Sequence, residues 1–72
     1  MTVFIVVETA DVEIIGLNVF SEAFEASRCF DSLCEENGVS NEAVLAEELS
    51  GTLRIAGDDA YAVQLIQRND IR

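Results

Sequence analysis

The residues best suited to a specific interaction are acids that recur along the stretch SEAFEASRCFDSLCEEN, residues 21–37. If this stretch is an α-helix, side chains three or four positions apart are neighbours, with about 5–6 Å between their Cβ atoms. The acids on its outward side are then Glu25, Asp31, Glu35 and Glu36. Such a row resembles the phosphates of a nucleic-acid strand in sign and roughly in spacing. We therefore predict that it binds a basic protein surface; the alternative is an ordinary solvated helix face.

Further residues extend this predicted partner-binding surface. Glu47 and Glu48 are expected to continue the acidic row onto a second helix. Phe24 falls between Asp31 and Glu35 on the helical wheel, well away from the apolar side. An exposed aromatic ring among acids suits an anchor against a basic patch. The alternative is that Phe24 folds over onto the second helix or the first hairpin.

Catalytic chemistry is not expected. The chain has no histidine and no lysine, and its arginines cannot accept a proton at neutral pH. The carboxylates at 35–36, 47–48 and 58–59 are adjacent in sequence, so each pair diverges on a helix or strand. Asp58 and Asp59 fall short of the six to eight oxygens that calcium requires, so a turn is the expected role. We predict no catalytic residue, no metal site and no cofactor, and thus a protein that is not an enzyme.

The two cysteines, Cys29 and Cys34, lie five positions apart within the predicted helix. That spacing turns them about 140° apart and separates them by about 7.5 Å of rise, which is too far for a disulfide. No third cysteine is available for a zinc site. Two reduced thiols in a cytosolic protein are expected, with a dimer linked through Cys29 as the alternative.

The charge balance limits the class of partner. Fourteen acids against four basic residues give a formal net charge of −10. A field of that sign repels nucleic acid and anionic membranes and attracts basic proteins. No apolar run approaches the roughly 18 residues of a membrane span, and TVFIVV after Met1 does not resemble a signal peptide. A cytoplasmic location is therefore expected, without direct nucleic-acid or membrane binding.

The predicted fold class is α+β, with residues 1–72 as a single domain. Valine and isoleucine concentrate at the two ends of the chain and alanine and glutamate in the middle, which predicts a sheet covered by helix. The order is ββααββ, a four-stranded antiparallel sheet with one long and one short helix on one face. Strand 1 is expected to be central and to pair with strand 3 or strand 4. The predicted strands are Thr2 to Thr9, Val12 to Phe20, Thr52 to Ala56 and Tyr61 to Gln67, and the predicted helices are Ser21 to Asn37 and Asn41 to Leu49.

Two details of this fold bear on function. Ser21 is the expected N-cap of the long helix and Gly38 its C′ residue. Its core-facing stripe is predicted to be Ala23, Ala26, Ser27, Phe30, Leu33 and Cys34. The opposite face of the sheet is expected to stay partly bare, carrying Phe4, Val6 and residues such as Tyr61 or Ile66, so that a homodimer or another partner covers it.

In size, charge and layout the chain resembles the small inhibitors encoded by phages and mobile elements, among them anti-CRISPR proteins and other nucleic-acid mimics. The resemblance rests on SEAFEASRCFDSLCEEN and on the acids of NEAVLAEELS, with no motif that assigns family residues. It implies an inhibitor that blocks the positively charged nucleic-acid channel of a CRISPR effector complex, in the host cytoplasm. The rival interpretation is a structural homo-oligomer whose acids serve solubility in a salty cytoplasm.

Overall fold

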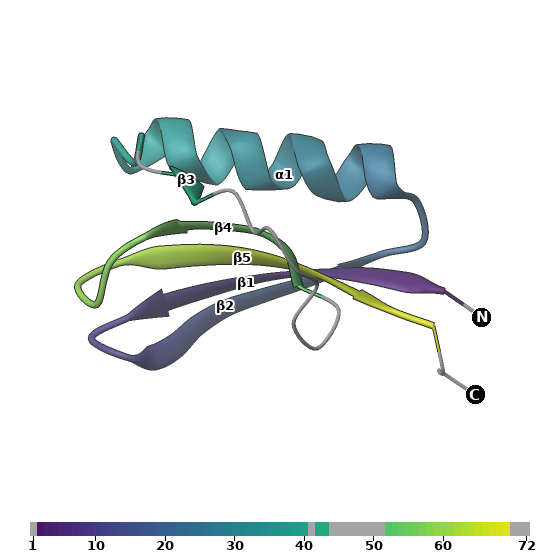
Figure 1. Cartoon of the computed structure of the whole chain (residues 1–72), viewed down its shortest axis with the longest axis horizontal. Helices are drawn as coiled ribbons and strands as arrows, with labels where there is room; N and C mark the ends of the chain where they lie inside the picture. Colours follow the sequence, from purple (N-terminus) through teal and green to yellow (C-terminus); the bar gives the residue numbers. More distant parts are fainter. Residues whose placement is uncertain (1, 41, 44–51, 70–72) are drawn as a thin grey trace.

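The computed structural model describes residues 2–40, 42–43 and 52–69. One helix lies across one face of an antiparallel sheet, so the described chain forms two layers (Figure 1). The strand order across the sheet is β2-β1-β5-β4-β3. The elements are β1 (Val3–Ala10), β2 (Glu13–Phe20), α1 (Ala23–Glu36), β3 (Glu42–Ala43), β4 (Thr52–Gly57) and β5 (Ala62–Arg68).

The two long hairpins follow from their sequences. β1 and β2 are rich in β-branched residues and are joined by only two residues, Asp11 and Val12. Both adopt positive φ, 52° and 60°, as a type I′ hairpin turn requires. β1 also pairs with β5, so it lies inside the sheet, as predicted. The turn between β4 and β5 is therefore at the same end of the sheet as the turn between β1 and β2.

The ends of α1 are set by different means. Glu22 is the N-cap and makes no side-chain capping hydrogen bond, so the prediction of Ser21 at this position was wrong. At the other end Gly38 adopts φ +67° and donates its N–H to Glu35 O, while Val39 N–H donates to Cys34 O. These two bonds form a Schellman motif, which confirms Gly38 as the C′ residue.

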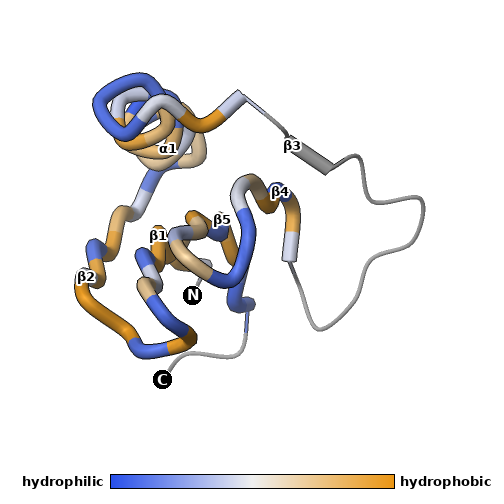
Figure 2. The backbone as a smooth tube through the Cα atoms, turned by 90° about the vertical axis from the view of Figure 1, so that its left-hand side faces the viewer, coloured by the Kyte–Doolittle hydropathy of each residue, from blue (hydrophilic) through white to orange (hydrophobic). Residues whose placement is uncertain are grey.

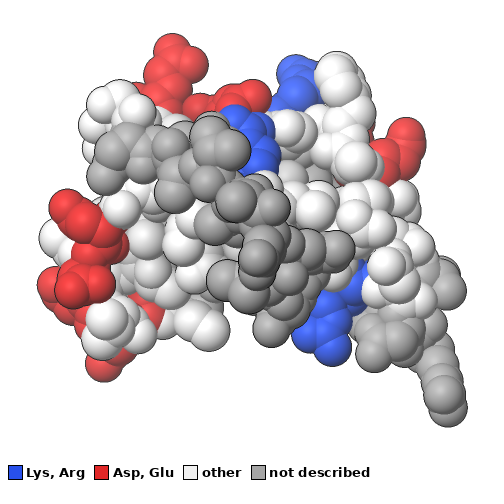
Figure 3. Space-filling model, in the orientation of Figure 1, with Lys and Arg blue, Asp and Glu red and all other residues white. Residues whose placement is uncertain are grey.

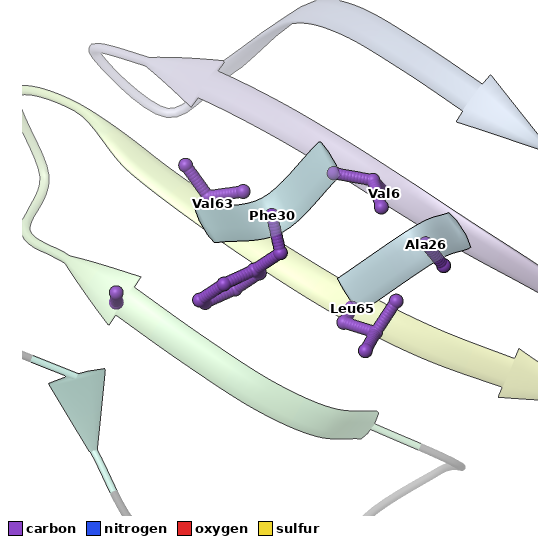
Figure 4. Close-up of a cluster of buried hydrophobic side chains, with 6 residues drawn as sticks. Val6, Ala26, Phe30, Val63 and Leu65 are labelled. Carbon is purple, nitrogen blue, oxygen red and sulfur yellow. The ribbon is translucent and has the colours of Figure 1, made fainter. Parts of the chain in front are cut away.

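The core lies between α1 and the three strands β1, β5 and β4. Ala26 and Phe30 point from the helix toward the sheet (Figure 4). Leu33 and Cys34 pack at the edge of this core, whereas Ala23, predicted to belong to it, is exposed. The buried residues are Val6, Ala26, Phe30, Ala56, Val63 and Leu65.

The predicted ββααββ order was wrong. Glu42 and Ala43, expected in a second helix, instead form a short strand opposite Ala56 and Ile55 of β4. Residues 44–49 of that predicted helix lie outside the described residues. Alanine and glutamate have high helix propensity, but here backbone pairing with the edge of β4 determines the local structure. α1 is the one helix in the described part of the chain.

The prediction of the bare sheet face was also largely wrong. Val6 is fully buried beneath α1, and Phe4 and Tyr61 pack against the same core. Strand alternation then places Ile5 on the opposite face, together with Ile66, with which it pairs. Of the residues predicted on the bare face, only Ile66 was assigned correctly. The others were misplaced because β1 is apolar on both faces, so alternation does not indicate which face the helix covers.

Candidate partner-binding surface

The predicted acidic residues on α1 are on the surface of the protein. α1 presents its polar side away from the sheet, and the acidic side chains of this face are exposed (Figure 3). Glu25, Glu35 and Glu36 all belong to this exposed set, as the helical wheel predicts. Glu47 and Glu48 lie outside the described residues. We refer to Phe24, Glu25, Glu35 and Glu36 as the acidic helix face.

Asp31 differs from the other predicted acids, because it has an internal partner. Arg54 Nη2 of β4 lies 2.9 Å from Asp31 Oδ1, and Arg54 Nη1 donates to Ser27 Oγ at 2.9 Å. The guanidinium carbon of Arg54 also lies 4.2 Å from the centroid of the Phe30 ring. Arg54 therefore ties β4 to α1 over the core, and its positive charge offsets that of Asp31. We exclude Asp31 from the acidic helix face for this reason.

Phe24 is 70% exposed, so it does not fold onto the first hairpin. Its one described ring contact with a cation is to Arg28, whose guanidinium carbon lies 5.7 Å from the ring centroid. Arg28 follows Phe24 by one helical turn and has the same outward orientation. The acidic helix face thus contains an aromatic ring with an arginine beside it rather than acids alone.

A second group of acids gathers at the end of the sheet where the two hairpin turns lie. Figure 3 shows this group at the left of the molecule. Asp11 N–H donates to Ala60 O, which joins the two turns. Asp58 Oδ1 accepts the N–H groups of Ala60 and Tyr61 at 2.9 and 3.2 Å, which confirms its predicted role in the turn. The acids of this end are Asp11, Glu13, Asp58 and Asp59.

Within the described residues no cluster of three or more histidine, cysteine or acidic side chains has the geometry to hold a metal ion. In the same part of the chain, no helix has the length and apolar character needed to cross a membrane. Neither Cys29 nor Cys34 forms a disulfide, as the spacing predicts. Burial, together with the nearby carboxylates of Glu8 and Glu36, raises the pKa of the Cys29 thiol.

Sequence reasoning missed a polar cluster between helix and sheet. Tyr61 Oη donates to Glu8 Oε2 at 2.7 Å, and Asn37 Nδ2 donates to Tyr61 Oη and to Leu33 O, each at 2.9 Å. These bonds connect the end of α1 to β1 and β5. Burial is the main cause that raises the pKa of the Tyr61 phenol, and the hydrogen bond to Glu8 is the second. The available signal was Glu8 itself, a single acid within an apolar strand.

Gly16 leaves the space that Glu8 occupies. Gly16 lies opposite Glu8 in the sheet, and a Cβ atom placed there would be 2.5 Å from Glu8 Oε1. A β-bulge follows at once in the same pair of strands. The group that approaches the backbone of Gly16 closely is thus the side chain of Glu8.

The Tyr61 cluster gives a testable dependence on pH. The pKa of Tyr61 is raised in the folded state. The phenol therefore contributes fully to the free energy of unfolding below its unfolded-state pKa of about 10, and this contribution is lost as the pH rises further. The Tyr61→Phe variant should lose about 1–2 kcal/mol at neutral pH. Its stability should then change less than that of the natural protein above pH ~10.

Urea unfolding at a series of pH values measures this difference. Tyr61 is the only tyrosine and the chain has no tryptophan, so phenolate absorbance titrates this one group. Equal alkaline loss of stability in both proteins, or an ordinary phenol titration, would contradict the assignment.

Together, the fold and the surface define a small two-layer α+β domain with an acidic outer helix. Comparisons with protein-family models, with curated proteins and with solved structures found no match for this chain.

Proposed function

We propose that the protein is a non-enzymatic binding protein that inhibits a nucleic-acid-binding partner. The acidic helix face would occupy a positively charged surface of that partner, in place of nucleic acid. The observation that carries this proposal is the exposure of Glu25, Glu35 and Glu36, with Phe24, on one side of a single helix.

The contacts that fix α1 on the sheet support binding through its outer face. The core, the Arg54 contacts and the Tyr61 cluster all hold α1 in place, so its outer side chains need little reordering of the backbone on binding. Preorganisation of this kind lowers the entropic cost of association. The net charge of −10 would also steer the protein toward a basic surface and accelerate encounter.

The partner class follows from charge and from the resemblance to phage-encoded inhibitors. A groove lined by arginine and lysine for DNA or RNA fits the acidic helix face, and the channel of a CRISPR effector complex is such a groove. The aromatic ring of Phe24 would lie against an arginine of that groove, since exposed cation–π pairs contribute about 0.5–1 kcal/mol. The proposed place of action is the cytoplasm of the host cell.

Two matched variants test the role of the acidic helix face. The first carries Glu25→Gln, Glu35→Gln and Glu36→Gln; the second carries Asp11→Asn, Glu13→Gln and Asp59→Asn. Each removes three acids and changes the net charge from −10 to −7, but only the first alters the helix. At about 0.5 kcal/mol per exposed charge, the helix variant should bind about 10-fold more weakly, and the turn variant should change little.

The partner is first captured from a bacterial lysate at low salt on the immobilised protein, eluted with a salt gradient and identified by mass spectrometry. Binding of the purified partner is then measured for the natural protein and both variants, with and without the partner's own nucleic acid. Support requires competition with nucleic acid and release at moderate salt. Binding that resists salt and is equal in both variants would instead favour acids that only keep the protein in solution.

A further inference from the structure

The face of the sheet that points away from α1 is apolar. Val6 is buried under the helix, so the neighbouring residues Ile5 and Val7 point to the opposite side. Ile5 pairs with Val19, and Val7 pairs with Leu17, which places these β2 residues on that side as well. We call this surface the back face and define it by Ile5, Val7, Ile14, Ile15, Leu17 and Val19.

The bulge brings Ile14 and Ile15 to the same side. Gly16 faces Glu8 on the helix side, so the residue before it, Ile15, points to the back face. Ile14 pairs with Thr9, the neighbour of Glu8, and therefore also points away from the helix. The extra residue at a bulge allows two consecutive side chains to point to the same face of the sheet. β2 thus adds two consecutive isoleucines to the back face. Figure 2 shows the hydrophobic colour along part of β2.

Among the described residues, nothing covers the β2 part of the back face, although the composition of the sheet indicates a cover. β1 is apolar on both sides, a pattern typical of strands that are covered on both faces. Yet the β2 members of the back face, Ile14, Ile15, Leu17 and Val19, are between 57% and 68% exposed. Scattered exposed aliphatic residues are normal, but a continuous row of this kind marks an interaction site.

Charge is distributed unevenly along the back face. Arg68 is on this side at one end of β5, opposite Val3, because β5 alternates from the buried Val63 and Leu65. At the other end a hollow of about 380 Å³ is lined by Thr9, Val12, Ile55, Asp58, Asp59 and Gln64, among others. The face therefore has an apolar middle, a cation at one end and two carboxylates at the other.

We propose that the back face binds the back face of a second copy of this chain, around a two-fold axis that runs across the strands. In this arrangement β2 lies over β2 of the other copy, and the strands of the two sheets run in opposite directions. Arg68 of each copy then lies near Asp58 and Asp59 of the other. The same patch serves both copies, as a two-fold interface requires.

The area of the face is sufficient for such a dimer. Val12, which lines the hollow at the turn end, adds exposed apolar surface to the β2 row, at 79% exposure. At roughly 180 Å² for a whole aliphatic residue, the exposed fractions amount to about 600 Å² per copy and about 1,200 Å² per dimer, within the range of specific interfaces. The two sheets would pack face to face about 10 Å apart, as in a β-sandwich.

The charge of the chain favours this face over any other for self-association. Two copies with a net charge of −10 each repel one another, and this repulsion is weakest where the contacting surfaces carry few acids. Among the defining residues of the back face there is no charged side chain, and Arg68 at its end is basic. Each α1 would remain on the outside of the dimer, so two acidic helix faces point away from the interface. This inference does not depend on the proposed function.

Sedimentation equilibrium of the full chain tests the dimer. The natural protein should show a mass of twice 7.9 kDa at about 100 μM. Leu17→Lys places a charge in the middle of the interface and should weaken dimerisation at least about 100-fold. Phe24→Lys is the matched control, because it adds the same charge at another exposed apolar residue, on the opposite layer, and it should leave the dimer intact.

Circular dichroism checks that each variant is folded. If Leu17→Lys fails to fold, the pair Leu17→Thr and Val19→Thr keeps a high strand propensity while reducing the apolar surface. A natural protein that sediments only as a monomer, or a dimer that survives the Leu17 variants, would overturn the proposal. Binding of an unrelated protein to the back face of a monomeric chain would also overturn it.

A charge exchange tests the orientation. Arg68→Asp should weaken the dimer about 10-fold, because both ends of the two-fold interface gain like charges. Adding Asp59→Arg to the same chain should restore affinity to within about threefold. Asp59 is chosen because Asp58 is needed for the turn. If the double variant is as weak as Arg68→Asp alone, the strands of the two sheets do not run in opposite directions.

Discussion

Replacing Phe30 by alanine is expected to lower the free energy of unfolding by about 4 kcal/mol, the largest effect of any single truncation among the described core residues. Phe30 is 1% exposed and is the largest of the fully buried side chains. The reason is the loss of transfer free energy together with the cavity that remains. A chain of this length is expected to have only about 4–11 kcal/mol of total stability.

The loss has a second component. Arg54 lies over the Phe30 ring, and without the ring its guanidinium keeps its bonds to Ser27 and Asp31 but loses a cation–π contact. Phe30→Leu separates the two components, because it keeps most of the volume and removes the aromatic face. It should cost about 1.5 kcal/mol.

Urea unfolding followed by circular dichroism, at one fixed protein concentration, measures these changes. Phe24→Ala is the control on the same helix. Phe24 is exposed and touches Arg28, so its removal should change stability by less than about 1 kcal/mol. If Phe24→Ala costs as much as Phe30→Ala, the helix does not have its described face toward the sheet.

The burial of Phe30 and the exposure of Phe24 could be predicted from the sequence. The helical period of Ala26, Phe30 and Leu33 identifies the buried side of α1, and the acids identify the other. The four long strands were also recognisable, because valine, isoleucine and threonine concentrate in them and short turns separate them. Local composition and period determine these features, so one sequence is enough to predict them.

The features that the sequence did not predict depend on contacts between distant residues. Glu42 and Ala43 were predicted to be helical from their own helix propensity. Their strand conformation instead depends on pairing with β4, which is distant in the sequence. The side of β1 that faces α1 could not be chosen, because Val6 and Ile5 are equally apolar. In each case the decisive partner lies far along the chain.

The candidate surface shows the same division. Exposure of Glu25, Glu35 and Glu36 follows from the helical wheel alone. The pairing of Asp31 with Arg54 spans 23 positions and offsets the charge of one predicted acid, which remains exposed. The hydrogen bond between Tyr61 and Glu8 spans 53 positions and places a tyrosine on the helix side that was expected on the bare face.

Replacing Gly57 by alanine is the second change for which we expect a large effect, about 3 kcal/mol or more. Gly57 ends β4 with φ +103°, a region that residues with a side chain rarely adopt. An added Cβ atom would also overlap the carbonyl oxygen of Tyr61 and the Cα atom of Ala62. These are backbone atoms of the adjoining turn and strand, so the clash cannot be relieved by rotating a side chain.

Gly38→Ala is the matched control. Gly38 also has positive φ, +67°, but no atom lies within 4 Å of the added Cβ atom. This variant should therefore lose only the cost of a left-handed residue, about 1 kcal/mol. Urea unfolding of both variants compares a left-handed residue with and without a steric clash. Equal losses in the free energy of unfolding would contradict the close packing of the turn after Gly57.

The Gly57 variant also has a local readout. Its turn holds Tyr61, whose N–H bonds to Asp58 and whose hydroxyl bonds to Glu8. If Gly57→Ala opens the turn while the rest of the sheet persists, the phenol should titrate nearer to its ordinary pKa, whereas Gly38→Ala should leave that titration closer to that of the natural protein. A Gly57 variant that is unstable but keeps the raised pKa of Tyr61 would mean that the strain spreads through β4 instead of opening the turn. The tyrosine titration therefore distinguishes a local opening from a general loss of stability, because it reports on the hydroxyl that joins this turn to both β1 and the end of α1.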